Sequence, residues 1–297
     1  MNYIDFHVHA FADKIAVRTI DTLQKTAGVA PATNGTLAAT QARMREWGVD
    51  GMVLLSIATK PSQHLVCNNW AASVKSECIF PFGSVHPDGE DALAELERIK
   101  ALGLYGIKLH PDYQGFYADE ARMLPIYRKC GELRLPVIFH AGLDPICPDD
   151  IHCTPAMAAR ILEKCPETTM ILAHLGGNAM WDEVETTLAG RFGNLYMDTA
   201  LTGRYVDEEQ LLRIIERHGA DKILLGSDCP WDATDTTIAK IKRLGLTEAQ
   251  ERMIFAENAE RVLGIESAAP TQEGLLAPPE PPSAGLGSPA PGDCESI

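Results

Sequence analysis

Short apolar runs alternate with amphipathic segments along most of the chain, and this alternation limits the possible folds more than any other feature. Eight such runs occur, at residues 3–8, 51–57, 78–85, 105–110, 135–140, 169–174, 194–200 and 222–228. Amphipathic segments of helical period follow most of them, for example at residues 91–103, 119–134, 155–164 and 207–219. Strands that alternate with helices indicate a parallel sheet covered by helices, and eight units predict an α/β fold, a single (β/α)8 TIM barrel.

The same elements could also form an open, doubly wound sheet. No glycine-rich phosphate-binding loop of the GxGxxG or Walker type follows any of the eight runs, so the open sheet has no ligand motif in its favour. The predicted barrel spans residues 1–265. Residues 266–297 are rich in Pro, Gly, Ala and Ser and have little to bury, and we therefore expect a disordered tail.

Composition and charge limit the expected partners and location of the protein. The chain has 297 residues, 45% of them hydrophobic, which is enough for a large core. Its formal net charge of −15, without a basic tract, excludes nucleic acid as an expected partner. No apolar stretch approaches the roughly 18 residues that cross a bilayer, and the N-terminus does not look like a signal peptide. We expect a cytoplasmic protein with no membrane partner, and the sequence leaves homo-oligomerisation open.

Residues 4–10, IDFHVHA, place two histidines two positions apart in the first run. Strand alternation predicts Ile4, Phe6 and Val8 on one face. Asp5, His7 and His9 then share the other face. Such a pair is compatible with a solvated edge strand or with two metal ligands, and the rest of the chain has to decide between them.

Other runs end in polar residues as well, and these ends meet at one rim of a barrel, where active sites of this fold are built. The residues concerned are Lys108 and His110, His140, His174 and Asp228. Neighbouring apolar residues such as Ile107 and Leu109 fall on the opposite phase, so we expect the polar side chains to point into the barrel. Imidazole nitrogens with a carboxylate suit Zn²⁺ best, and also Mn²⁺, Fe²⁺, Co²⁺ or Ni²⁺.

Four short segments together resemble one family. They are HVH at 7–9, FHAG at 139–142, AHLGG at 173–177 and GSDCPW at 226–231. They resemble the amidohydrolase superfamily, in the amidohydrolase-related branch that includes aminocarboxymuconate semialdehyde decarboxylase. The resemblance implies that His7, His9, His140 and Asp228 bind a divalent metal. It also implies that His174 polarises or deprotonates the metal-bound water, whose proton Asp228 takes or shuttles.

Lys108 departs from the decarboxylase pattern. We predict that Lys108 and His110 bind the substrate, with the ammonium gripping a carboxylate beside a single metal ion. The alternative is a carbamylated Lys108, as in superfamily hydrolases with two metals, which would recruit a second ion through His140 and His174.

The predicted function is a metal-dependent hydrolase that uses a metal-activated water on an amide, lactone or ester of a small, carboxylated metabolite. A non-oxidative decarboxylase of the same superfamily is the first alternative. A non-catalytic metal-binding barrel is the second, and the complete ligand set argues against it.

The eight cysteines lack the paired spacings of a zinc ribbon or a disulfide scaffold, and we expect most of them to be reduced and buried. One local cluster, Cys147, His152 and Cys153, contains metal-ligand residue types. It lacks the fourth ligand that a structural zinc site needs.

Overall fold

The computed structural model describes residues 2–265, and the predicted tail at 266–297 lies outside the described residues. Eight strands alternate with helices, and every paired strand runs parallel to its neighbour. The strands are β1 (Ile4–Val8), β2 (Gly51–Leu55), β3 (Ile79–Phe82), β4 (Ile107–Leu109), β5 (Val137–Phe139), β6 (Met170–Leu172), β7 (Leu195–Asp198) and β8 (Ile223–Leu224). Each lies within one of the eight apolar runs.

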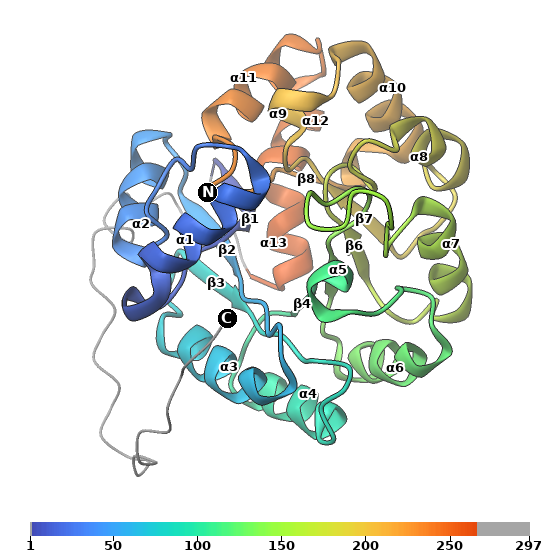
Figure 1. Ribbon diagram of the computed structural model, residues 1–297. Helices are drawn as coiled ribbons and strands as arrows, with labels where there is room; N and C mark the ends of the chain where they lie inside the picture. The colour runs from blue at the N-terminus through green and yellow to red at the C-terminus, as the bar shows by residue number, and fades with distance from the viewer. Residues whose placement is uncertain (1, 266–297) are drawn as a thin grey trace.

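Two bridges close the strands into a barrel. Continuous ladders join β1 to β3 and β4 to β8. Parallel bridges between Gly83 and Ile107, and between Val8 and Cys229, connect the two ladders at both of their edges. Figure 1 shows the resulting ring of strands inside a ring of helices. The predicted (β/α)8 barrel is confirmed.

The helices cover the outside of the barrel. The longer ones are α1 (Asp13–Ala27), α2 (Leu37–Glu46), α3 (His64–Ser73), α4 (Ala92–Ala101), α6 (Leu124–Leu133), α7 (Pro155–Lys164), α8 (Trp181–Thr187), α10 (Glu208–His218) and α11 (Thr234–Arg243). The four amphipathic segments expected to be helical correspond to α4, α6, α7 and α10. No helix within residues 2–265 is long and apolar enough to span a bilayer.

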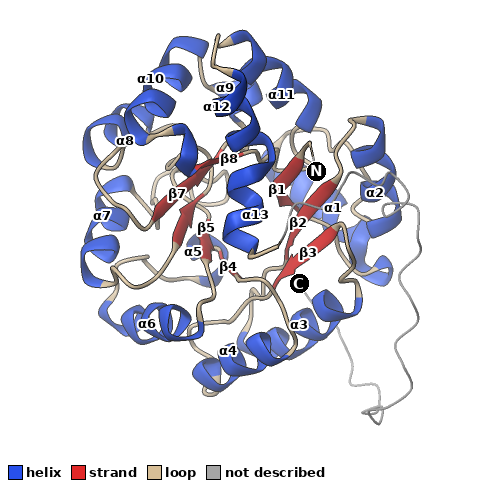
Figure 2. Cartoon of the chain, turned by 180° about the vertical axis from the view of Figure 1, so that it is seen from behind, coloured by secondary structure: helices blue, strands red, loops and turns tan. Residues whose placement is uncertain are grey.

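The far end of the barrel is closed by α13 (Asn258–Leu263), which lies across the opening when the molecule is seen from behind (Figure 2). Ala259 and Leu263 pack against strand residues that point into the barrel, among them Phe6 and Ile138. The side chain of Asn258 donates hydrogen bonds of 2.7 Å to the backbone carbonyls of Ala220, just before β8, and Ile223, its first residue. The open rim is therefore at the other end, where the strands finish.

Strand β1 corrects the simple alternation predicted for residues 4–9. Ile4 and Phe6 lie in the interior cluster with Phe82, whereas Val8 packs in an outer cluster with α2. The pairing register with β2 shifts between Asp5 and Val8, as in a β-bulge, and an extra residue reverses the phase of the strand. Asp5 consequently faces away from the barrel axis, while His7 and His9 still face it.

Candidate metal centre

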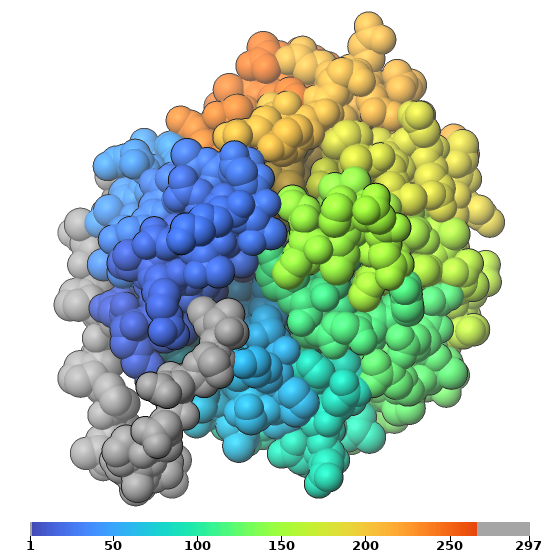
Figure 3. Space-filling view, in the orientation of Figure 1, coloured from blue at the N-terminus to red at the C-terminus, as the bar shows by residue number. Residues whose placement is uncertain are grey.

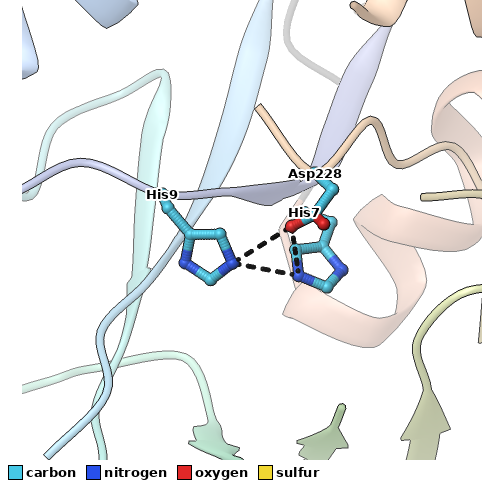
Figure 4. A group of neighbouring side chains, drawn as sticks. All are labelled: His7, His9 and Asp228. Carbon is cyan, nitrogen blue, oxygen red and sulfur yellow. Dashed lines mark hydrogen bonds and ion pairs between the residues drawn. The ribbon is translucent and has the colours of Figure 1, made fainter. Parts of the chain in front are cut away.

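His7, His9 and Asp228 bring three ligand atoms together at the rim of the barrel (Figure 4). The two Nε2 atoms lie 3.2 Å apart, and each lies 3.3 Å from Oδ1 of Asp228. Ligands at about 2.0–2.1 Å from a tetrahedral ion lie about 3.3 Å from one another. The spacing of these three atoms therefore fits a divalent metal ion.

The orientation of both rings supports the same conclusion. Nδ1 of His7 lies 2.8 Å from Oδ2 of Asp198, and Nδ1 of His9 lies 3.0 Å from the carbonyl oxygen of Leu55. When Nδ1 donates to an oxygen, Nε2 is left with its lone pair, which is the usual arrangement of a metal-binding histidine. Both rings thus present a free nitrogen to the same point.

Asp198 is a site residue that the sequence analysis missed. It ends β7 and is fully buried. Its second oxygen, Oδ1, accepts a hydrogen bond of 2.9 Å from the backbone amide of His174. The reasoning that selected polar residues at the ends of the other strands would have found it in the run at 194–200.

The protonation states also suit a cation. Burial, followed by the nearby Lys108, lowers the pKa of His7 well below its usual value, so the ring is neutral. Burial alone would raise the pKa of Asp228, but the adjacent His7 and a hydrogen bond with His9 outweigh it, and the net pKa is lowered. Neutral imidazole and ionised carboxylate are the forms that bind metals.

His174 lies next to this group but outside it. It follows β6 in a left-handed backbone conformation, with φ of 59°, so the turn after the strand sets its direction and strand alternation does not. Its ring centroid is 5.3 Å from that of His7, and its Nδ1 lies 3.4 Å from the carbonyl oxygen of Ala200. Its Nε2 is directed toward His140, whose Nδ1 lies 3.0 Å away.

The ring of His140, the fourth expected ligand, is directed toward His174 and not toward the group of His7, His9 and Asp228. Its Nδ1 lies 3.0 Å from Nε2 of His174, and it belongs to a second group of ligand-type residues with His110 and Asp144. Its Nε2 is buried without a hydrogen-bond partner among the described residues and lies 3.6 Å from Oδ2 of Asp144. The structure thus assembles three of the four expected ligands and pairs the fourth with His174.

Lys108 lies inside the barrel, as its phase in the strand predicts. Ile107 and Leu109 pack outward in the main core, and Lys108 is fully buried with Nζ 3.4 Å from Nε2 of His7. Burial lowers the pKa of Lys108 to about 8, although the carboxylates of Asp198 and Asp228 oppose the shift.

Two further residues border His110 and were not predicted. The His110 ring stacks between the rings of His140 and Tyr113, with centroid distances of 4.3 and 3.9 Å. Oδ2 of Asp144 lies 3.5 Å from Nε2 of His110. Burial raises the pKa of Asp144 to about 6. In the space-filling view, segments from the blue, green and orange parts of the chain meet at the centre of this face (Figure 3), which agrees with the burial of the site residues.

Comparison with known families identifies the class of protein. Residues 4–265 match the family model described as amidohydrolase, and the chain belongs to this family. It is an enzyme of the amidohydrolase superfamily with metal-dependent catalysis. No curated protein sequence matches the chain at a significant level.

Solved structures share the fold at low sequence identity. An uncharacterised TIM-barrel protein, Bb4693 from Bordetella bronchiseptica, is 21% identical with a TM-score of 0.71, over 89% of this chain and 99% of its own. Dihydroxybenzoic acid decarboxylase from Polaromonas sp. JS666, solved with manganese and 2-nitroresorcinol, is 20% identical with a TM-score of 0.69, over 90% and 98%. A Pseudomonas putida protein, provisionally assigned as 2-pyrone-4,6-dicarboxylic acid hydrolase, is 17% identical with a TM-score of 0.62, over 90% and 99%.

Proposed function

We propose that the protein is a metal-dependent hydrolase of a small, carboxylated metabolite that contains an amide, lactone or ester bond. The observation that carries this proposal is the position of Lys108, a buried cation whose Nζ lies 3.4 Å from a nitrogen of the His7, His9 and Asp228 group. An anionic substrate that bridges the ammonium and the metal would relieve the repulsion between these two positive charges.

His7, His9 and Asp228 would hold the ion, and His140 would join them if its ring turned away from His174. Zn²⁺ suits this donor set, and so does the Mn²⁺ found in the Polaromonas structure. When bound, the ion supplies a Lewis acid that polarises the substrate carbonyl and lowers the pKa of water.

The chain's own residues would then handle protons and orient the substrate. His174 would accept a proton at Nε2 from the attacking water, and Asp228 would shuttle that proton to the leaving group. Lys108 binds the substrate carboxylate. His110, stacked between two rings, forms part of the wall that fixes the substrate plane.

A second candidate is a non-oxidative decarboxylase. The name of the Polaromonas protein favours it, and so does a buried lysine able to bind a carboxylate. In this reaction the substrate loses CO₂, and a proton is delivered to the carbon that carried it. His174 is the residue placed to deliver that proton.

Isotope labelling separates the two reactions. Metal-loaded protein would be incubated with a panel of carboxylated lactones, esters, amides and hydroxybenzoic acids in H₂¹⁸O and, separately, in D₂O. Hydrolysis places ¹⁸O in the product acid, whereas decarboxylation places deuterium on carbon and releases CO₂. Mass spectrometry reads both. The His9→Ala variant serves as the control without a competent site, and deuterated product without ¹⁸O incorporation would replace the hydrolase proposal with the decarboxylase.

The number of metal ions is a separate part of the proposal. We favour one ion in this centre, with Lys108 as a free ammonium. The 3.0 Å approach of the His140 and His174 nitrogens is the observation that favours two, because these atoms could hold a second ion beside a carbamylated Lys108. Anomalous diffraction from crystals grown with Zn²⁺ would count the ions, and a carbamate would appear as added density on Nζ.

A further inference from the structure

A second cluster of metal-ligand residues lies outside the centre described above. Asp112, on the short helix α5 (Pro111–Gln114), meets Cys147 and His152 from the loop between β5 and α7. One ligand atom from each lies within 4.8 Å of the other two. Helix α5 follows the end of β4 directly and lies beside it in Figure 1.

The buried carboxylate of Asp112 lacks hydrogen-bond partners among the described residues. Its side chain is fully buried, and within residues 2–265 its one ion-pair partner is His110 at 3.8 Å, which is too long for a hydrogen bond. Neither oxygen accepts a hydrogen bond of normal geometry, although the backbone amides of Asp112 and His152 lie near. A buried carboxylate without partners is costly, and a bound cation would compensate it.

His152 is oriented like a metal ligand. Its Nδ1 lies 3.3 and 3.2 Å from the carbonyl oxygens of Pro111 and Phe116, so this nitrogen carries the proton. Nε2 is left with a lone pair on the side of the cluster. The ring is also packed against Tyr117, at a centroid distance of 4.6 Å.

Cys147 and Asp150 complete the surroundings. Cys147 is half-buried on the loop, so its thiol can turn toward the other two ligands. Oδ2 of Asp150 lies 3.5 Å from Nε2 of His152, and Tyr117 donates a hydrogen bond to the same carboxylate. Cys153, considered from the sequence as part of this cluster, is instead buried in the hydrophobic core.

We propose that Asp112, Cys147 and His152 form a second metal site, which binds Zn²⁺ or a similar divalent ion, with Asp150 or water as the fourth ligand. Thiolate, imidazole and carboxylate are the three ligand types of zinc proteins. The ion ties the loop after β4 to the loop after β5. Asp144, which faces His110 and His140, lies three residues before Cys147, so the ion stiffens one wall of the catalytic pocket.

Cobalt distinguishes this site from the catalytic one. The catalytic group contains no cysteine, so a sulfur-to-Co²⁺ charge-transfer band in the near ultraviolet reports only a thiolate-bound ion. We expect the band to develop when Co²⁺ is added to the metal-free full-length protein, to reach its maximum when both this site and the catalytic site are filled, at two ions per chain, and to disappear when Zn²⁺ is added.

Four variants locate the site. Cys147→Ser should abolish the band, and Asp112→Asn should raise the Co²⁺ dissociation constant at least about tenfold, since it removes an anionic ligand. Cys67→Ser, at another half-buried cysteine, and Cys294→Ser, outside the described residues, should keep it. Circular dichroism checks that each variant is folded. A wild-type protein without the band, or a folded Cys147→Ser variant that retains it, would overturn the proposal whatever reaction the enzyme catalyses.

Discussion

Asp198 and the carbonyl of Leu55 each hold one nitrogen of a rim histidine and leave the other free. These hydrogen bonds are stronger support for His7 and His9 as metal ligands than their spacing in the sequence, because they fix which nitrogen of each ring is free. His174 is held in a similar way by Ala200, but at a longer distance of 3.4 Å and outside the three-atom group. The barrel interior therefore contains histidines inside the three-atom group, His7 and His9, and a histidine outside it, His174. Substitutions should have different effects at these two kinds of position.

The first prediction compares His9→Ala with His174→Ala. His9→Ala removes one of three grouped ligands, so the variant should lose both the catalytic metal and activity. His174→Ala should keep the metal and lose about 10²- to 10⁴-fold in kcat, the usual contribution of a general acid or base. Metal analysis and steady-state kinetics on the substrate found by isotope labelling measure both. Loss of metal from the His174 variant would mean that His174 is itself a ligand.

The second prediction concerns Lys108. If its ammonium binds the substrate carboxylate, Lys108→Met should retain the catalytic metal and raise KM for carboxylated substrates, while KM for uncharged ester analogues changes little. Added bicarbonate should not stimulate the wild-type enzyme. Loss of metal from the variant, together with bicarbonate activation, would support a carbamylated lysine that bridges two ions.

At the scale of elements, the apolar runs predicted the fold because strand and helix periods persist over whole segments. All eight strands and the compared helices follow from them, and so does the inward direction of Lys108. The expected directions of Ile4, Phe6 and Asp5 were wrong because the register of β1 shifts between Asp5 and Val8, and no local sequence pattern indicates such a bulge. The contacts of Asp112 and Tyr113, on the short helix α5, and of Asp144, on the loop after β5, depend on local conformations that no periodicity encodes.

The third prediction follows from His218 at the end of α10. A helix C-terminus favours a protonated histidine, but burial outweighs this and lowers the pKa of His218 to about 4. The ring is neutral in the fold, where its Nδ1 accepts a hydrogen bond from the amide of Gly190. The unfolded chain binds a proton more readily, so stability falls as pH drops from about 6.5 to 4, by roughly 3 kcal/mol for this residue.

Urea unfolding at a series of pH values tests this expectation. The His218→Asn variant should show a smaller loss of stability than wild type across the same window, since asparagine does not titrate. Parallel curves for the two proteins would show that His218 contributes nothing to the pH dependence. Other buried histidines titrate in both proteins and cancel in the comparison.

At the scale of the whole molecule, the barrel is complete within residues 2–265, because β8 meets β1 and α13 closes the far end. The fourth prediction is that truncation after residue 265 leaves melting temperature and turnover unchanged. Truncation after residue 252 should lower the melting temperature strongly, because it removes Ala256, Ala259 and Leu263 from the interior cluster. Calorimetry and activity assays compare both truncated proteins with the full-length chain. A large loss of melting temperature or turnover on truncation after residue 265 would show that residues 266–297 contribute to stability or activity.

The junction of β1 and β8 determines when the catalytic metal can bind. Asp228 donates a backbone hydrogen bond to the carbonyl of His7 at 2.9 Å, and His9 donates one to Cys229 at 2.7 Å, so the ligands come from the two ends of the barrel sequence. A partly folded chain in which these ends are apart lacks the three-atom group. The ion therefore stabilises only the finished ring, by about 2.7 kcal/mol at a concentration one hundred times its dissociation constant. Metal supply in the cell would thus affect how long each folded molecule survives as well as how fast it works.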